Sequence, residues 1–220
     1  MIRKRDYLLL ACLTLAGLIG CASTAAPSHH LQPEQYFAKG LLESDPQLDQ
    51  LQRNWYGSML AAMNEPVLTA IDKPPNYFAL RILFLPTWGH PVVIRYEGHG
   101  THGTYRAVEL TGQGGYSPGH VRFSKSGKLS KQELANIKSA LEDSGYWSLP
   151  QKDNVMGMDG SQLIIETVKS NKYRVFERWT PSSNAHSRGL EKLVALYTSQ
   201  FEQFGLWPAH RPNKLSKRTR

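Results

Sequence analysis

Apolar residues recur along the chain with two different periods, and the period separates helices from strands. Two stretches, residues 130–145 and 187–204, repeat their apolar residues every three or four positions, as one face of a helix does. A third helix is expected after Asp45, because aspartate followed by proline is typical of a helix N-terminus. Its apolar residues are predicted to form one stripe in the core: Leu48, Leu51, Trp55, Met59 and Met63.

Short runs rich in branched and aromatic residues predict β-strands. The expected strands are residues 80–85, 92–97, 105–110, 162–168 and 172–179. The last two are expected to form a hairpin through Lys169-Ser170-Asn171, which places Glu166 opposite Arg174 as an ion pair. The order of these runs predicts an α+β fold, a mostly antiparallel sheet of about five strands with two or three helices packed on one side.

The helix at residues 130–145 has the clearest local signals. Ser130 with Glu133 three positions later is a capping box, and Leu129 with Leu134 forms a hydrophobic staple across it. Gly145 is expected to end this helix.

The first 20 residues combine a basic head at 3–5 with an apolar run at 7–19, as a secretion signal does. A helix over that run would be about 20 Å long, too short for a hydrocarbon core of roughly 30 Å, so a retained membrane span is not expected. Leu18-Ile19-Gly20-Cys21 resembles the lipobox of bacterial lipoproteins. The resemblance implies cleavage after Gly20 and attachment of diacylglycerol and then palmitate to Cys21. An ordinary secretion signal with a cysteine here by chance is the alternative.

The same resemblance implies a location in the cell envelope. Residue 22 is alanine rather than aspartate, which by enteric-type lipoprotein sorting favours the outer membrane, facing the periplasm. The expected organisation follows from these boundaries: residues 1–20 signal peptide, 21–33 lipidated tether, 34–75 N-terminal helical segment, 76–208 α+β domain and 209–220 basic disordered tail.

The formal net charge of +8 comes almost entirely from the two ends of the chain. The tail at 209–220 is basic and has no acidic residue, whereas residues 21–208 are nearly neutral. The tail is interpreted either as a solubilising end or as a contact to an anionic envelope component. Nucleic acid is not an expected partner.

The two cysteines restrict the chemistry of the mature chain. Cys12 leaves with the signal and Cys21 carries lipid, so neither a disulfide nor a thiolate metal site is expected. Four histidines in glycine-rich loops are candidate ligands for zinc or copper: His90, His99, His102 and His120. Tight turns are the simpler interpretation of those loops, and no cofactor is expected.

Residues of the second half form a pattern that includes Gly114-Gly115-Tyr116, Asp159-Gly160-Ser161 and Arg178-Trp179. Over residues 80 to 200 this pattern resembles a group of uncharacterised bacterial proteins, although Leu163 stands where that group has an aromatic residue. The resemblance brings no activity with it and implies a structural signature. In it Asp159 caps a turn and Arg178 pairs with a carboxylate, and these two residues are the candidate binding residues.

The sequence therefore favours a non-catalytic binding or scaffolding module of the envelope, with an envelope protein as a candidate partner. No residue is assigned as catalytic. One alternative is an enzyme for a cell-wall or lipid substrate that uses Asp159, Glu177 and the loop histidines. The other alternative is a periplasmic protein that binds metal through the four histidines.

Overall fold

The computed structural model describes residues 32–69 and 73–206. The lipobox with Cys21, most of the expected tether and the basic tail lie outside these residues. Among the helices that are described, none is both long and apolar enough to cross a membrane.

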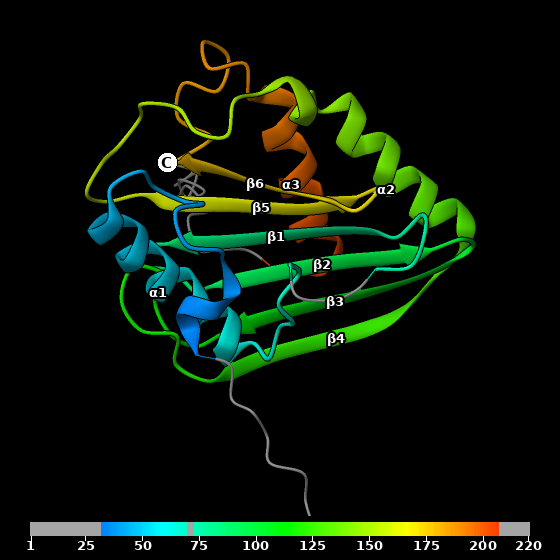
Figure 1. Ribbon diagram of the computed structural model, residues 1–220, viewed down its shortest axis with the longest axis horizontal. Helices are drawn as coiled ribbons and strands as arrows, with labels where there is room; N and C mark the ends of the chain where they lie inside the picture. The colour runs from blue at the N-terminus through cyan, green and yellow to red at the C-terminus, as the bar shows by residue number, and fades with distance from the viewer. Residues whose placement is uncertain (1–31, 70–72, 207–220) are drawn as a thin grey trace, which may run out of the picture. The chain divides into compact units, whose positions relative to one another are not determined.

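One antiparallel sheet organises the described chain, with the strand order β4-β3-β2-β1-β5-β6 (Figure 1). The strands are β1 (Phe78–Pro86), β2 (Val92–His99), β3 (His102–Leu110), β4 (Val121–Leu129), β5 (Ser161–Lys169) and β6 (Lys172–Trp179). The predicted α+β class is confirmed, with six strands in place of about five.

The strand that the sequence did not predict is β4, at one edge of the sheet. It is mostly polar and exposed, and Phe123 and Leu129 are its only apolar contributors to the core. It forms because β3 pairs with it along its length, from Gly103 opposite Leu129 to Leu110 opposite Val121, with one shift in register between Glu109 and Leu110. A strand held by backbone pairing at an edge carries little hydrophobic signal in its sequence.

Helices cover both faces of the sheet (Figure 1). The helices α2 (Lys131–Asp143) and α3 (Glu191–Gln203) pack on one face, as predicted for two of the three helices. The helix α1 (Pro46–Ala62) and the short 3₁₀ helix η1 (Pro33–Tyr36) pack on the opposite face. The capping box of α2 is present, with Ser130 and Glu133 bonded to each other's backbone N–H groups at 3.2 and 2.7 Å. Gly145 follows α2 with a φ of 74°.

The buried face of α1 differs from the predicted stripe in its first half. Leu48 and Leu51 are exposed, whereas Asp49 is 1% exposed. The Asp49 carboxylate accepts hydrogen bonds from the backbone N–H groups of Gly40 and Leu42 at 3.0 and 3.1 Å. These bonds turn the polar position inward, and the apolar face begins only from the middle of the helix, at Tyr56, Met59, Leu60 and Met63.

The hairpin of β5 and β6 has a two-residue loop, so the predicted three-residue loop is wrong. Ser170 and Asn171 both have positive φ, 51° and 59°, as in the turn that matches strand twist. Glu166 therefore lies opposite Val175, and Arg174 lies opposite Thr167.

Candidate binding cleft

A cleft of about 490 Å³ opens at the end of the sheet where β1 and β6 end and β5 begins. We call it the β1–α3 cleft. Its lining comes from four stretches that are far apart in the sequence: Phe84, Pro86, Trp88, Gly89, Asp159, Gly160, Ser161, Thr180, Ser182, Val194, Tyr197, Thr198 and Phe201.

The floor of the β1–α3 cleft is aromatic. Phe84 of β1 lies 5.7 Å from Tyr197 and 5.6 Å from Phe201, measured between ring centroids, and both partners belong to α3. The three rings are also part of the core between the sheet and α3. A ligand in the cleft would therefore contact an apolar surface that packing already holds in place.

The rest of the lining mixes apolar and polar residues, and it carries few reactive groups. Hydroxyl groups come from Ser161, Thr180, Ser182 and Thr198, and Asp159 is the single charged residue in the lining. The described lining contains no histidine, lysine or cysteine. Such a set can donate and accept hydrogen bonds and can bind a cation, and among the described lining residues no hydroxyl donates a hydrogen bond to the Asp159 carboxylate.

Backbone hydrogen bonds join the loops around the cleft. Thr87 donates its N–H to the carbonyl of Gly160 at 2.9 Å, and the N–H of Gly160 returns to Thr87 Oγ1 at 3.1 Å. The loop between β3 and β4 is also bonded to this region. The Gly114 N–H donates to the carbonyl of Gly89, and the Gly115 N–H donates to the carbonyl of Thr87. These hydrogen bonds fix the loops at the mouth of the cleft relative to one another, and we call the bonded residues Thr87, Gly89, Gly114, Gly115 and Gly160 the frame.

Two glycines in this frame have no room for a side chain. A Cβ on Gly160 would lie 2.1 Å from Thr180 Oγ1, and a Cβ on Gly114 would lie 2.6 Å from the backbone of Leu85 and Pro86. Both belong to the pattern that resembles the uncharacterised bacterial proteins. A side chain at either position would clash with these atoms, so the packing of these loops requires glycine at both.

An exposed aromatic pair stands at the mouth of the cleft. The rings of Trp88 and Tyr116 have centroids 5.1 Å apart, and the residues are 56% and 60% exposed. The indole N–H of Trp88 donates to Asp159 Oδ1 at 3.2 Å. The pair and the carboxylate thus form one continuous rim.

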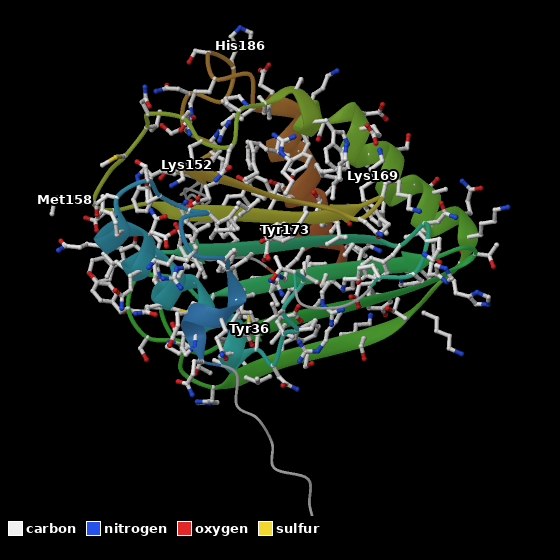
Figure 2. All side chains as sticks on the ribbon, in the orientation of Figure 1. Tyr36, Lys152, Met158, Lys169, Tyr173 and His186 are labelled. Atoms are coloured by element: carbon white, nitrogen blue, oxygen red, sulfur yellow. The ribbon has the colours of Figure 1, made fainter. Side chains whose placement is uncertain are left out.

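Further apolar side chains are exposed on neighbouring loops. Met156 and Met158 are 89% and 93% exposed, and Met158 projects from the edge of the fold (Figure 2). Met158 directly precedes Asp159 in the chain, and Met156 lies two positions earlier. Exposed apolar groups of this size beside a cleft are typical of surfaces that another molecule covers.

The two candidate binding residues are separated by the structure. Asp159 lies in the cleft, whereas Arg178 is 2% exposed and does not line it. The Arg178 guanidinium donates to the carbonyls of Pro150 and Gln151 at 2.7 and 2.9 Å, and it pairs with Asp153 at 3.3 Å. Burial lowers the pKa of Arg178 to about 10, which Asp153 opposes. Arg178 therefore holds the segment before β5 against β6.

Glu177, a candidate for an acid or base, also lies outside the cleft lining. Its carboxylate accepts from the Tyr56 hydroxyl at 2.9 Å and pairs with Lys152 at 3.3 Å. Burial raises the pKa of Glu177, and Lys152 and Tyr56 oppose the change. These contacts join α1 to β6.

The four loop histidines lie at two ends of the sheet. His99 and His102 face each other at the hairpin of β2 and β3, while His90 precedes β2 and His120 precedes β4 at the other end. The length of β2 separates the two groups by about 23 Å. In residues 32–69 and 73–206, no group of three or more His, Cys, Asp or Glu side chains is placed to hold a metal ion.

A second cluster of charged groups is buried on the face that α1 covers. Arg81, Arg95 and Arg106 lie directly opposite one another on β1, β2 and β3, and Glu166 of β5 lies opposite Arg81 on its other side. Arg81 donates to Glu166 Oε2 at 2.6 Å. The predicted cross-strand partner of Glu166, Arg174, is thus replaced by an arginine from a distant part of the sequence.

Glu65 completes this cluster from the segment after α1. Its Oε2 and Oε1 atoms bind Arg95 and Arg106 at 2.7 Å each, and Oε2 also lies 3.7 Å from Arg81. Burial raises the pKa of Glu166, and Arg81 opposes the change. The arginines are already held by carboxylates, so the cluster stabilises the fold and offers no open site.

Sequence reasoning identified Asp159 but missed the aromatic and hydroxyl residues that line the cleft with it. In the sequence, Tyr197 and Phe201 have the spacing of ordinary core positions of a helix, and Trp88 lies in a predicted turn.

No protein-family model and no curated protein matches this chain.

Proposed function

We propose that this protein is a lipid-anchored lipoprotein of the cell envelope whose folded domain binds a ligand in the β1–α3 cleft without transforming it. The observation that carries the proposal is the convergence of four distant stretches on one cleft with an aromatic floor and a rim of two aromatic rings and one carboxylate. Pockets of this size and composition are typical of small-molecule sites. The braced loops supply the fixed geometry that binding requires.

The exposed residues around the mouth support binding over a purely structural function. Trp88, Tyr116, Met156 and Met158 keep large apolar surfaces in water. A ligand that fills the cleft, or a protein that carries it, would cover these surfaces. The lining of the cleft supplies donors and acceptors but no paired nucleophile and base among its residues.

The membrane part of the proposal depends on Cys21. One acyl chain holds a protein only marginally at a membrane, whereas the three chains of a mature lipoprotein hold it stably. Growth with an alkyne-labelled palmitate is expected to label the native chain in the outer-membrane fraction, and Cys21→Ala is expected to remove the label. Label that persists in Cys21→Ala would refute lipidation at this residue.

The cleft can be tested with a fluorescent probe before its ligand is known. We suggest the chain from residue 21 onward with Cys21→Ser, called the unlipidated chain, so that no detergent competes. The uncharged probe N-phenyl-1-naphthylamine is expected to brighten when it binds the aromatic floor. Thr198→Trp would fill the cleft, and Ser199→Trp would add the same ring at an exposed neighbouring position of α3.

The proposal predicts that Thr198→Trp abolishes the fluorescence increase and that Ser199→Trp retains it. Circular dichroism on both variants shows whether they fold. A probe that fails to bind the unlipidated chain, or that binds the folded Thr198→Trp variant equally well, would overturn the cleft as a binding site.

A further inference from the structure

The charge of the β1–α3 cleft depends on one residue. Asp159 is exposed and is the only acidic or basic residue in the described lining. Within the described parts of the chain, no Lys, Arg or His nitrogen lies within 4.0 Å of its carboxylate. An anionic ligand would therefore meet an uncompensated negative charge, and a cationic ligand would neutralise it.

Two other acidic residues, Asp153 and Glu177, have cationic partners. Asp153, six positions earlier, pairs with Arg188 at 2.8 Å and with Arg178 at 3.3 Å. Glu177 on β6 pairs with Lys152. The fold thus supplies cations to these two carboxylates, whereas the Asp159 carboxylate in the cleft has no Lys, Arg or His partner among the described residues.

The carboxylate of Asp159 is held in position beside an aromatic surface. The Trp88 indole N–H binds Oδ1 at 3.2 Å, and Gly160, the next residue, is bonded to Thr87 on both its N–H and its carbonyl. The rings of Trp88 and Tyr116 remain exposed. Indole and phenol faces attract cations that approach within about 6 Å of the ring centroid.

We infer that the β1–α3 cleft takes a ligand with a protonated amine on an apolar stem, with the amine bound by Asp159 beside Trp88 and the stem lying on Phe84, Tyr197 and Phe201. This inference rests on the proposed function. It assigns the head and the stem to different parts of the lining, since the rim carries the charge and the floor is aromatic. Either a free alkylamine or a lysine side chain of a peptide has this chemistry.

Three six-carbon compounds separate the contribution of the head from that of the stem. Hexylammonium, hexanol and hexanoate would each compete with N-phenyl-1-naphthylamine for the unlipidated chain at pH 7. Hexylammonium is expected to compete about tenfold more strongly than hexanol, because it adds a carboxylate partner and a cation–π contact at an exposed rim. Hexanoate is expected to be the weakest competitor.

Asp159→Asn tests the residue itself, because the amide keeps an acceptor for the Trp88 N–H and removes only the charge. The variant is expected to lose most of the preference for hexylammonium over hexanol, keeping only the part due to the cation–π contact, and to retain the probe. Asp143→Asn is the matched control, since it removes the same charge from the exposed face of α2. It is expected to keep the tenfold preference.

The two proposals fail in different ways in this experiment. Hexanol that competes as well as hexylammonium, or a preference unchanged in Asp159→Asn, would overturn the amine ligand while the cleft remained a binding site. A native chain that binds neither probe nor competitor would overturn the proposed function itself. N-acetyl-lysine methylamide distinguishes the sources: it competes like hexylammonium if the site takes a peptide-borne lysine, and at least tenfold more weakly if the site takes a free amine.

Discussion

Removing the charge of Glu65 is expected to destabilise the fold by about 3 kcal/mol. Taking one partner from a buried ion pair costs roughly 3–5 kcal/mol, because the remaining charge stays in a medium of low polarity. Glu65 is 3% exposed and binds Arg95 and Arg106, with Arg81 close by. The loss falls at the lower end of the range because Arg81 keeps Glu166, and because Arg95 and Arg106 can regain some water.

The substitution Glu65→Gln is preferred because it preserves volume and creates no cavity. Urea unfolding of the unlipidated chain at pH 7, followed by circular dichroism, would give the free energy of unfolding. Glu142→Gln is the control, since its pair with Lys169 is half exposed and should contribute no more than about 1 kcal/mol. A loss below about 1 kcal/mol for Glu65→Gln, at an unchanged denaturant dependence, would refute the account of the buried cluster.

Four further substitutions test the packing of the fold by the same urea measurement. Burial raises the pKa of Glu177 above its usual 4.5, so the folded protein binds this proton more readily than the unfolded chain and loses stability as the pH rises through that window. Glu177→Gln should therefore gain stability relative to the native chain as the pH rises above 4.5, and a flat difference would contradict this. Ser170→Gly should raise stability by about 0.5 kcal/mol, because it relieves a φ of 51°; a loss would contradict the turn. Met59→Ala should cost about 2–5 kcal/mol and Leu51→Gln about 0.5 or less, and equal costs would contradict the observed buried face of α1.

The parts of the fold that the sequence predicted are those with short-range causes. The capping box joins Ser130 and Glu133, which are three positions apart, and α2 begins directly after Ser130. The positive φ of Gly145 is likewise a local signal, and α2 ends just before it. The strand β4 lacks such a cause, because its stability comes from the backbone of β3. Its polar sequence therefore reads as a loop.

The predicted pairing of Glu166 failed for a related reason. Local pairing favoured Arg174 in the hairpin, but Arg81 lies 85 positions away in the sequence and provides the ion pair. The pattern of apolar residues could not have predicted this ion pair. Arg81 is the only charged residue in the otherwise apolar strand β1, and the pattern does not show which residue faces it. Only the strand order, with β1 between β2 and β5, brings the two residues together.

The cleft shows the same limit at the level of function. Asp159 stood out because it belongs to a recognisable turn, but its neighbours in space come from β1, from the loop after β6 and from α3. In the sequence, each of those stretches is fully explained as a strand, a loop or the buried face of a helix, so none of them indicates a binding site. The site arises where they meet, and that meeting depends on long-range contacts.

The frame and the rim of the cleft depend on different kinds of residue, and this has a consequence for ligand preference. The frame is held by hydrogen bonds among Thr87, Gly89, Gly114 and Gly160. Substitutions at Gly114 or Gly160 should therefore disrupt the shape of the cleft itself. The rim is carried by exposed side chains, of which Asp159 supplies the charge. Substitution at Asp159 should therefore change which ligand binds while the frame stays intact, and that separation makes the preference for an amine testable apart from the cleft.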